Sequence, residues 1–156
     1  MSELPDAQSN EVCIVDDDPS VLKSMQYLLA SEGFKVRPFN KAQDFLAHAG
    51  AHHVPVVVTD IWMDEVTGLE LLARLCAISP RTKVIVITAR PNQYDHAQKM
   101  RIDALMEKPL DLPLLLQTIN HLIVEPDEER IRRITDRNFR TALLNPLNRP
   151  EDSNGP

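Results

Sequence analysis

The chain has 156 residues, of which 43% are hydrophobic, and its formal net charge is -6. This length is typical of a single domain with a core of its own, and the acidic balance disfavours a nucleic-acid binder, which usually presents a basic face. No apolar run approaches the roughly 18 residues of a membrane span, and no basic and then apolar leader opens the chain. We therefore expect a soluble, cytoplasmic protein. The cysteines, Cys13 and Cys76, lack C-x-x-C spacing, so a reduced protein is the simple interpretation, with a disulfide left open.

The hydrophobic pattern alternates five times between short β-branched runs and segments with apolar side chains at helical spacing. After a flexible leader over residues 1–10, strands are expected over residues 11–16, 35–39, 55–60, 83–88 and 104–106. Asp18 and Pro19 are typical of the start of the first helix, and Gly33 of its end. Further helices are expected after an Asn40 cap and over residues 69–78, 90–101 and 112–123, with a loop over residues 48–53. This order predicts an α/β fold with a doubly wound, five-stranded parallel sheet.

The pattern changes after residue 123. Residues 124–144 are interpreted as a linker and a charged helix, and residues 145–156 as a disordered tail. Acids and arginines four apart support an exposed helix: Glu128 with Arg132, Glu129 with Arg133, and Asp136 with Arg140. The arginines at 130, 132, 133, 137 and 140 could bind nucleic acid, but their acidic neighbours favour a solvated helix. The helix is also a candidate to mediate a homodimer or to cover a face of the domain.

Polar side chains follow the predicted strands. Asp16 and Asp17 end the first strand, Asp60 the third, Thr88 the fourth, and Lys108 comes just after the fifth. The carboxyl ends of parallel strands meet at one edge, where ligands bind in such sheets. Clustered carboxylates suit Mg2+, and an ionised Asp60 could attack phosphorus to form an acyl phosphate. Lys108 would pair with the phosphoryl group, and Thr88 would donate a hydrogen bond to it.

These motifs resemble the receiver domains of two-component response regulators. The matching stretches are I-V-D-D-D-P-S at 14–20, V-V-T-D-I-W-M at 57–63 with Gly68, V-I-T-A at 86–89 and E-K-P-L at 107–110. The resemblance covers residues 11–123 and implies the flavodoxin-like receiver fold. It is strongest to receivers that precede a helix-turn-helix output domain, although the tail is too short for such a domain.

The resemblance also implies roles for individual residues. Asp60 would be the phosphoryl acceptor, and Thr88 and Lys108 the switch pair. Asp17, Asp60 and the main-chain carbonyl of Trp62 would ligate Mg2+, with Asp16 acting through water. The donor would be a sensor histidine kinase or a phosphotransfer protein, and output would pass by contact with a downstream protein. Phosphoryl acceptance and autodephosphorylation would be self-assisted, so the chain is not expected to be a free-standing enzyme.

Three departures from the family pattern stand out. Asp64 replaces the usual proline, Leu105 replaces the aromatic switch residue, and residues 101–103 replace a glycine-alanine pair. We expect these changes to alter kinetics or readout without removing the acceptor.

Two other functions remain open. A haloacid-dehalogenase-type phosphohydrolase would use Asp16 as nucleophile and Asp18 as acid, but this leaves Asp60 unexplained. A degenerate receiver would act only as a binding module. The five histidines, including His48, lack metal-ligand spacing and are interpreted as surface residues.

Overall fold

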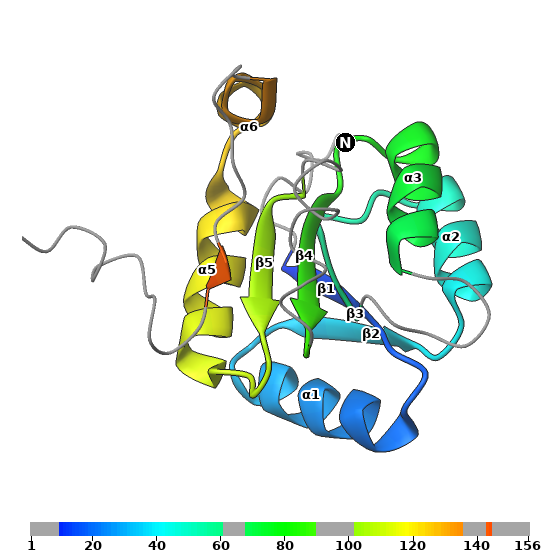
Figure 1. Cartoon of the computed structure of the whole chain (residues 1–156), viewed down its shortest axis with the longest axis vertical. Coiled ribbons are helices and arrows are strands. Elements are labelled where there is room, and N and C mark those ends of the chain that lie inside the picture. The colour runs from blue at the N-terminus through cyan, green and yellow to red at the C-terminus, as the bar shows by residue number, and fades with distance from the viewer. Residues whose placement is uncertain (1–9, 61–67, 90–101, 136–142, 145–156) are drawn as a thin grey trace, which may run out of the picture.

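A parallel sheet forms the centre of the computed structural model, with its strands in the order β2-β1-β3-β4-β5-β6 (Figure 1). The structure describes residues 10–60, 68–89, 102–135 and 143–144. The strands are β1 Glu11–Val15, β2 Lys35–Phe39, β3 Val56–Asp60, β4 Lys83–Thr88, β5 Ala104–Glu107 and β6 Leu143–Leu144. The helices are α1 Pro19–Ser31, α2 Ala42–Ala51, α3 Gly68–Ile78, α5 Leu112–Val124 and α6 Asp127–Thr135. The predicted α/β fold with five parallel strands is confirmed, and the helix expected over residues 90–101 lies outside the described residues.

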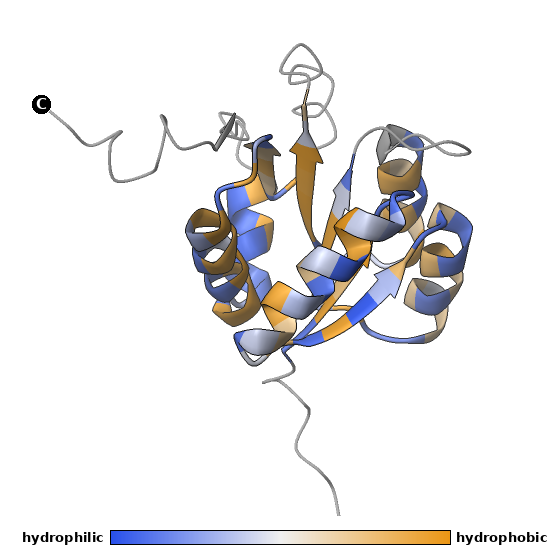
Figure 2. Ribbon diagram, turned by 90° about the horizontal axis from the view of Figure 1, so that it is seen from below, coloured by the Kyte–Doolittle hydropathy of each residue, from blue (hydrophilic) through white to orange (hydrophobic). Residues whose placement is uncertain are grey.

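The inner strands are apolar on both faces, as expected for parallel strands covered by helices. Every residue of β4 is buried, as are the first four of β3. Alternate residues face opposite layers: Val56 and Val58 pack toward α1 and α5, whereas Val57 packs toward α2 and α3. Figure 2 shows hydrophobic residues concentrated on the central strands and on the helix sides around them. The right-handed crossovers of such a sheet place helices on both faces.

Two helix starts follow local rules that the sequence displays. The Asp18 carboxylate accepts a hydrogen bond from the Ser20 N–H at 2.9 Å, ahead of Pro19 in the first turn. Asp111 caps α5 in the same way, through the Leu114 N–H at 3.0 Å. Gly33 has a φ of 96°, in the left-handed region that favours glycine after a helix.

The prediction for α2 was wrong at both ends. The helix is capped at Lys41, which makes no side-chain cap bond, and not at Asn40. It continues through His48 to Ala51, where a loop was expected. Ala49 is buried against the sheet, so tertiary packing extends the helix beyond the apolar pattern that signals it.

The C-terminal region also differs from the prediction of one helix reaching residue 144. Within the described residues, helix α6 covers Asp127–Thr135. Leu143 and Leu144 instead form a parallel strand on β5, opposite Leu105 and Met106. No helix among the described residues is both long and apolar enough to cross a membrane.

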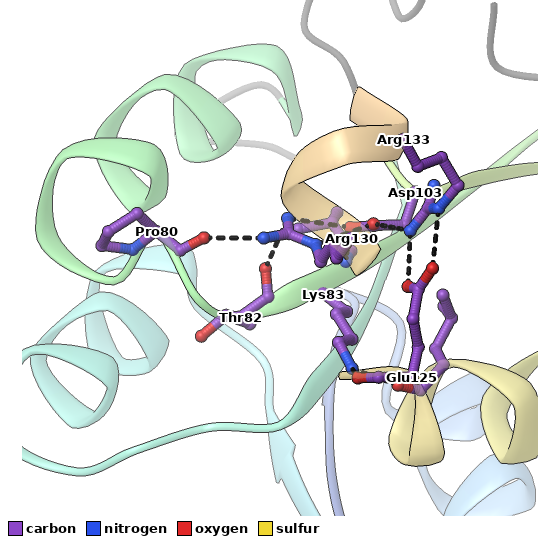
Figure 3. Close-up of polar contacts among 9 residues, drawn as sticks. Pro80, Thr82, Lys83, Asp103, Glu125, Arg130 and Arg133 are labelled. Carbon is purple, nitrogen blue, oxygen red and sulfur yellow. Dashed lines mark hydrogen bonds and ion pairs between the residues drawn. The ribbon is translucent and has the colours of Figure 1, made fainter. Parts of the chain in front are cut away.

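A cluster of buried and half-buried charges holds α6 against the start of β5 (Figure 3). We call Asp103, Glu125, Arg130 and Arg133 the C-terminal anchor. The Asp103 side chain is fully buried and accepts hydrogen bonds from Arg130 Nε at 2.9 Å and Arg133 Nη2 at 2.7 Å. Arg133 also pairs with Glu125 at 2.8 Å. The expectation of a solvated arginine face was therefore wrong for Arg130, which is buried, and Arg133 bonds to residues outside its own helix.

Candidate functional site

The carboxyl ends of four strands converge on the residues that the sequence singled out. Asp16 directly follows β1, Asp60 ends β3, Thr88 ends β4, and Lys108 directly follows β5. The register pairs Asp60 with Ile87, and Thr88 with Glu107. This alignment places all four residues along the same edge of the sheet.

Lys108 joins two of these strand ends. Its Nζ donates a hydrogen bond to Asp60 Oδ2 at 2.8 Å, and its backbone N–H donates to the Thr88 carbonyl at 2.8 Å. Partial burial opposes the charge of Lys108, but the hydrogen bond and the charge of Asp60, helped by Asp16, outweigh it and raise the lysine pKa. Lys108 is therefore a fixed cation at neutral pH, placed at the carboxylate that ends β3.

Asp16 lies in a strongly acidic environment. Its carboxyl group is buried, and Oδ1 accepts a hydrogen bond from the Asp18 N–H at 2.9 Å. Burial, together with the charges of Asp60 and Asp17, raises the pKa of Asp16, although the Asp18 N–H and Lys108 oppose the shift. The edge therefore gathers more negative charge than Lys108 compensates. A hard divalent cation with oxygen ligands, such as Mg2+, fits this donor set.

A cavity of about 440 Å³ opens beside these residues. Asp16, Asp60 and Lys108 line it together with side chains from α1, among them Ser20, Ser24 and Leu28. The sequence pattern does not assign Ser20 and Ser24 to the site, because serines four apart on an amphipathic helix are typical of its solvent face. We call the edge of the sheet that holds Asp16, Asp60 and Lys108 the acidic edge. It is open to a molecule that approaches over α1.

The structure brings together Asp16, Asp60 and Lys108, and aligns Thr88 with them through the Lys108 backbone. Asp17, the next acid, is half-buried and electrostatically close to Asp16. Trp62 and Asp64 lie outside the described residues. Leu105 is fully buried in the core beside Val84 and Val86, so an aliphatic side chain fills the position of the aromatic switch.

Known sequences similar to this chain have the same domain. A family model described as the response regulator receiver domain matches residues 12–120. The transcriptional regulatory protein FixJ of Rhizobium meliloti (strain 1021) is 34% identical over 110 residues, covering 69% of this chain and 54% of FixJ. The transcriptional regulatory protein GlrR of Escherichia coli (strain K12) is 30% identical over 133 residues, covering 84% of this chain and 29% of GlrR. The chain thus spans about half, or less, of the length of these relatives.

Solved structures show the same arrangement of elements. The crystal structure of FixJ-N is 31% identical with a TM-score of 0.71, over 76% of this chain and 97% of that one. The beryllofluoride-activated NtrC4 receiver domain dimer is 28% identical with a TM-score of 0.68, over 78% of this chain and 98% of that one. TrrA of Thermotoga maritima, solved in complex with Mg(2+)-BeF, shares the fold at 20% identity and a TM-score of 0.67, over 72% of this chain and 98% of that one.

Proposed function

The chain belongs to the family of response regulator receiver domains of two-component signalling, and on that premise we propose that Asp60 is its phosphoryl acceptor. The observation that carries the proposal is the 2.8 Å contact between Lys108 Nζ and Asp60 Oδ2, at an edge that also holds Asp16. A carboxylate beside a fixed ammonium and next to an open cavity is placed to accept a phosphoryl group.

In the proposed reaction, a carboxylate oxygen of Asp60 attacks the phosphorus of a phosphohistidine. A phosphorus–oxygen bond forms while the phosphorus–nitrogen bond breaks, and the departing imidazole takes up a proton. Lys108 is then next to the new phosphoryl oxygens as a point charge, and the Thr88 hydroxyl donates a hydrogen bond to them. Attack by water on phosphorus hydrolyses the acyl phosphate, which releases inorganic phosphate and restores the Asp60 carboxylate.

The acidic edge would bind Mg2+ in the proposed switch. Asp17, Asp60 and the main-chain carbonyl of Trp62 would be the ligands, and Asp16 would act through water. When bound, Mg2+ offsets negative charge on the phosphoryl oxygens. Asp16 supports this assignment, because its buried carboxyl group lies among acids whose repulsion a cation relieves.

We propose that the donor, a sensor histidine kinase or a phosphotransfer protein, approaches over α1. The cavity beside Asp60 is lined by α1, and the neighbouring helix surface exposes Tyr27 and Leu28 to solvent. Tyrosine at the centre of a contact surface often contributes strongly to binding. The free thiols of Cys13 and Cys76 are compatible with a reducing cytoplasm, where we place the reaction.

We propose that output passes by protein contact, with a downstream protein or a second copy of the chain. Arg130 and Arg133 support this choice over nucleic acid, because both bond to buried or half-buried acids within the fold. A phosphohydrolase that uses Asp16 is not favoured, since the chain belongs to the receiver family and Asp60 holds the lysine contact.

Intact mass spectrometry after incubation with acetyl phosphate and Mg2+ tests the acceptor. We expect one phosphoryl adduct on the wild type, none on Asp60→Asn, and an unchanged adduct on Asp44→Asn, a control at an exposed acid of α2. An adduct that survives Asp60→Asn would overturn the assignment and direct attention to Asp16. If neither acetyl phosphate nor a phosphorylated histidine donor modifies the wild type, the degenerate binding module becomes the better explanation.

A further inference from the structure

Three side chains of metal-ligand type meet at the edge of the sheet opposite Asp60. Glu11 and Cys13 alternate along β1 on the face that α2 covers, and His48 comes from the last turn of α2. One ligand atom from each residue lies within 4.8 Å of the other two. A carboxylate oxygen, a thiol sulfur and an imidazole nitrogen at this separation are within reach of one transition-metal ion.

The His48 ring contains a polar atom without a hydrogen-bond partner. Among the described residues, its Nε2 is buried and has no partner. The ring itself lies against Phe39 and stacks on His52, with centroids 4.7 Å apart. Burial and the nearby charge of Arg37 lower the pKa of His48, although Glu11 opposes the shift. The imidazole is therefore neutral at physiological pH, which is the form that ligates metals.

Cys13 supplies the softest ligand. Its side chain is fully buried and makes no disulfide. Burial and the charge of Glu11 raise the pKa of the thiol to about 12, so the sulfur keeps its proton until a cation displaces it. Metal ions bind the thiolate and release that proton.

Glu11 already pairs with Arg37, whose Nε lies 2.9 Å from Glu11 Oε2. The Arg37 side chain is 54% exposed, so this ion pair is of the surface kind that contributes little to stability. Because Arg37 is largely exposed, solvent can replace Glu11 as its partner. Coordination of Glu11 to a metal therefore requires only a small rearrangement at the surface.

We propose that Glu11, Cys13 and His48 form a binding site for a transition-metal ion, with Zn2+ as the physiological candidate. Mixed sulfur, nitrogen and oxygen ligands favour Zn2+ over Mg2+, which prefers oxygen alone. The site would tie α2 to β1 at the end of the sheet away from the acidic edge. Three protein ligands leave a fourth tetrahedral position for water or a further ligand. This inference does not depend on phosphorylation of Asp60.

Absorption spectroscopy with Co2+ tests the site, because a cobalt–thiolate bond gives an intense near-ultraviolet band that carboxylate sites lack. The reduced protein is titrated in excess Mg2+, so that the acidic edge is occupied. We expect the band to saturate at one Co2+ per chain and to be lost in Cys13→Ser. Cys76→Ser and His121→Gln, at exposed positions on α3 and α5, serve as matched controls and should keep it.

Zn2+ affinity, measured by competition with a chromophoric chelator, extends the test to less buried positions. We expect His48→Gln and Glu11→Gln each to weaken Zn2+ binding by more than about tenfold, because each removes a direct ligand and loss of an outer-shell partner alone costs about tenfold to a hundredfold. Circular dichroism confirms that each variant is folded. The proposal is overturned if the wild type gives no thiolate band, if the band depends on Cys76, or if folded His48→Gln binds Zn2+ as tightly as the wild type.

Discussion

At the carboxyl end of β1, the buried Asp16 carboxyl group lies beside two other acids, and its pKa is raised above the ordinary value. The folded state therefore binds a proton more tightly than the unfolded chain does. The free energy of unfolding consequently falls as the pH rises from 3.8, the ordinary value, through the folded-state pKa. At neutral pH the full destabilisation is present. A buried, repelled carboxylate such as that of Asp16 lowers the free energy of unfolding, a cost that functional sites commonly carry.

Asp16→Asn removes this charge while keeping an oxygen that can accept the Asp18 N–H. In Mg2+-free buffer we expect the free energy of unfolding at pH 7 to rise by about 0.5–2 kcal/mol, the usual range for stabilising substitutions. The gain should shrink as the pH is lowered toward 3.8. Urea denaturation across this pH range measures it, with Asp44→Asn as the exposed control. A gain that does not change with pH would show that repulsion at Asp16 is not its cause.

Helix α6 shows how an element can depend on long-range charge contacts. Arg130 bonds to Asp103 through Nε and Nη2, at 2.9 and 3.1 Å, and to the Pro80 carbonyl at 2.9 Å. Lys83 donates to the carbonyls of Leu122 and Glu125 just before α6 begins. A nine-residue helix is too short to be stable in isolation. The C-terminal anchor therefore holds α6 in place.

Arg130→Met removes the cation that pairs most extensively with the buried Asp103 carboxylate. We expect the free energy of unfolding to fall by about 3 kcal/mol, because breaking a buried pair leaves a partly uncompensated charge. Arg132→Met, at an exposed position of the same helix, should change it by less than about 0.5 kcal/mol. Urea denaturation distinguishes the two variants, and equal small effects would contradict an anchoring role for Arg130.

Local patterns predicted the strands and the cap of α1, because their signals lie within a few residues of one another, whereas the Asp111 cap of α5 was not predicted. The C-terminal anchor had no such signal. Arg130 is surrounded in sequence by charged residues, as in a solvated helix, and its partner Asp103 is 27 residues away. Leu143 and Leu144 are too few to display a strand period, and their partner strand, β5, is distant in the sequence.

Across the whole molecule, the residues that meet at the acidic edge could be predicted from the sequence. The cluster of Glu11, Cys13 and His48 could not. Parallel strands necessarily bring their carboxyl ends together, so Asp16, Asp60 and Lys108 could be grouped from strand order alone. His48 was interpreted as a surface residue because no metal-ligand spacing surrounds it. Its proximity to Glu11 and Cys13 arises only when α2 packs on β1, which a local pattern does not encode.

Strand β5 connects the C-terminal anchor to the acidic edge, because Asp103 lies just before the strand and Lys108 just after it. Five residues of extended chain separate their Cα atoms by about 17 Å. Sites farther apart than about 10 Å, with no shared partners, usually contribute additively to stability. The C-terminal anchor and the acidic edge should therefore act independently, unless β5 transmits a change between them.

Thermal unfolding with and without Mg2+ tests this independence. At a Mg2+ concentration about a hundred times Kd, linkage predicts a stabilisation of about 2.7 kcal/mol for the wild type. We expect the same increment in Arg130→Met, although its starting stability is lower, and a much smaller one in Asp60→Asn, which lacks a carboxylate at the proposed metal site. An increment in Arg130→Met that differs from the wild type by more than about 0.5 kcal/mol would indicate coupling. That result would show that the C-terminal anchor and the proposed Mg2+ site are coupled, and substitutions within β5, which joins Asp103 to Lys108, would then test whether the strand carries the coupling.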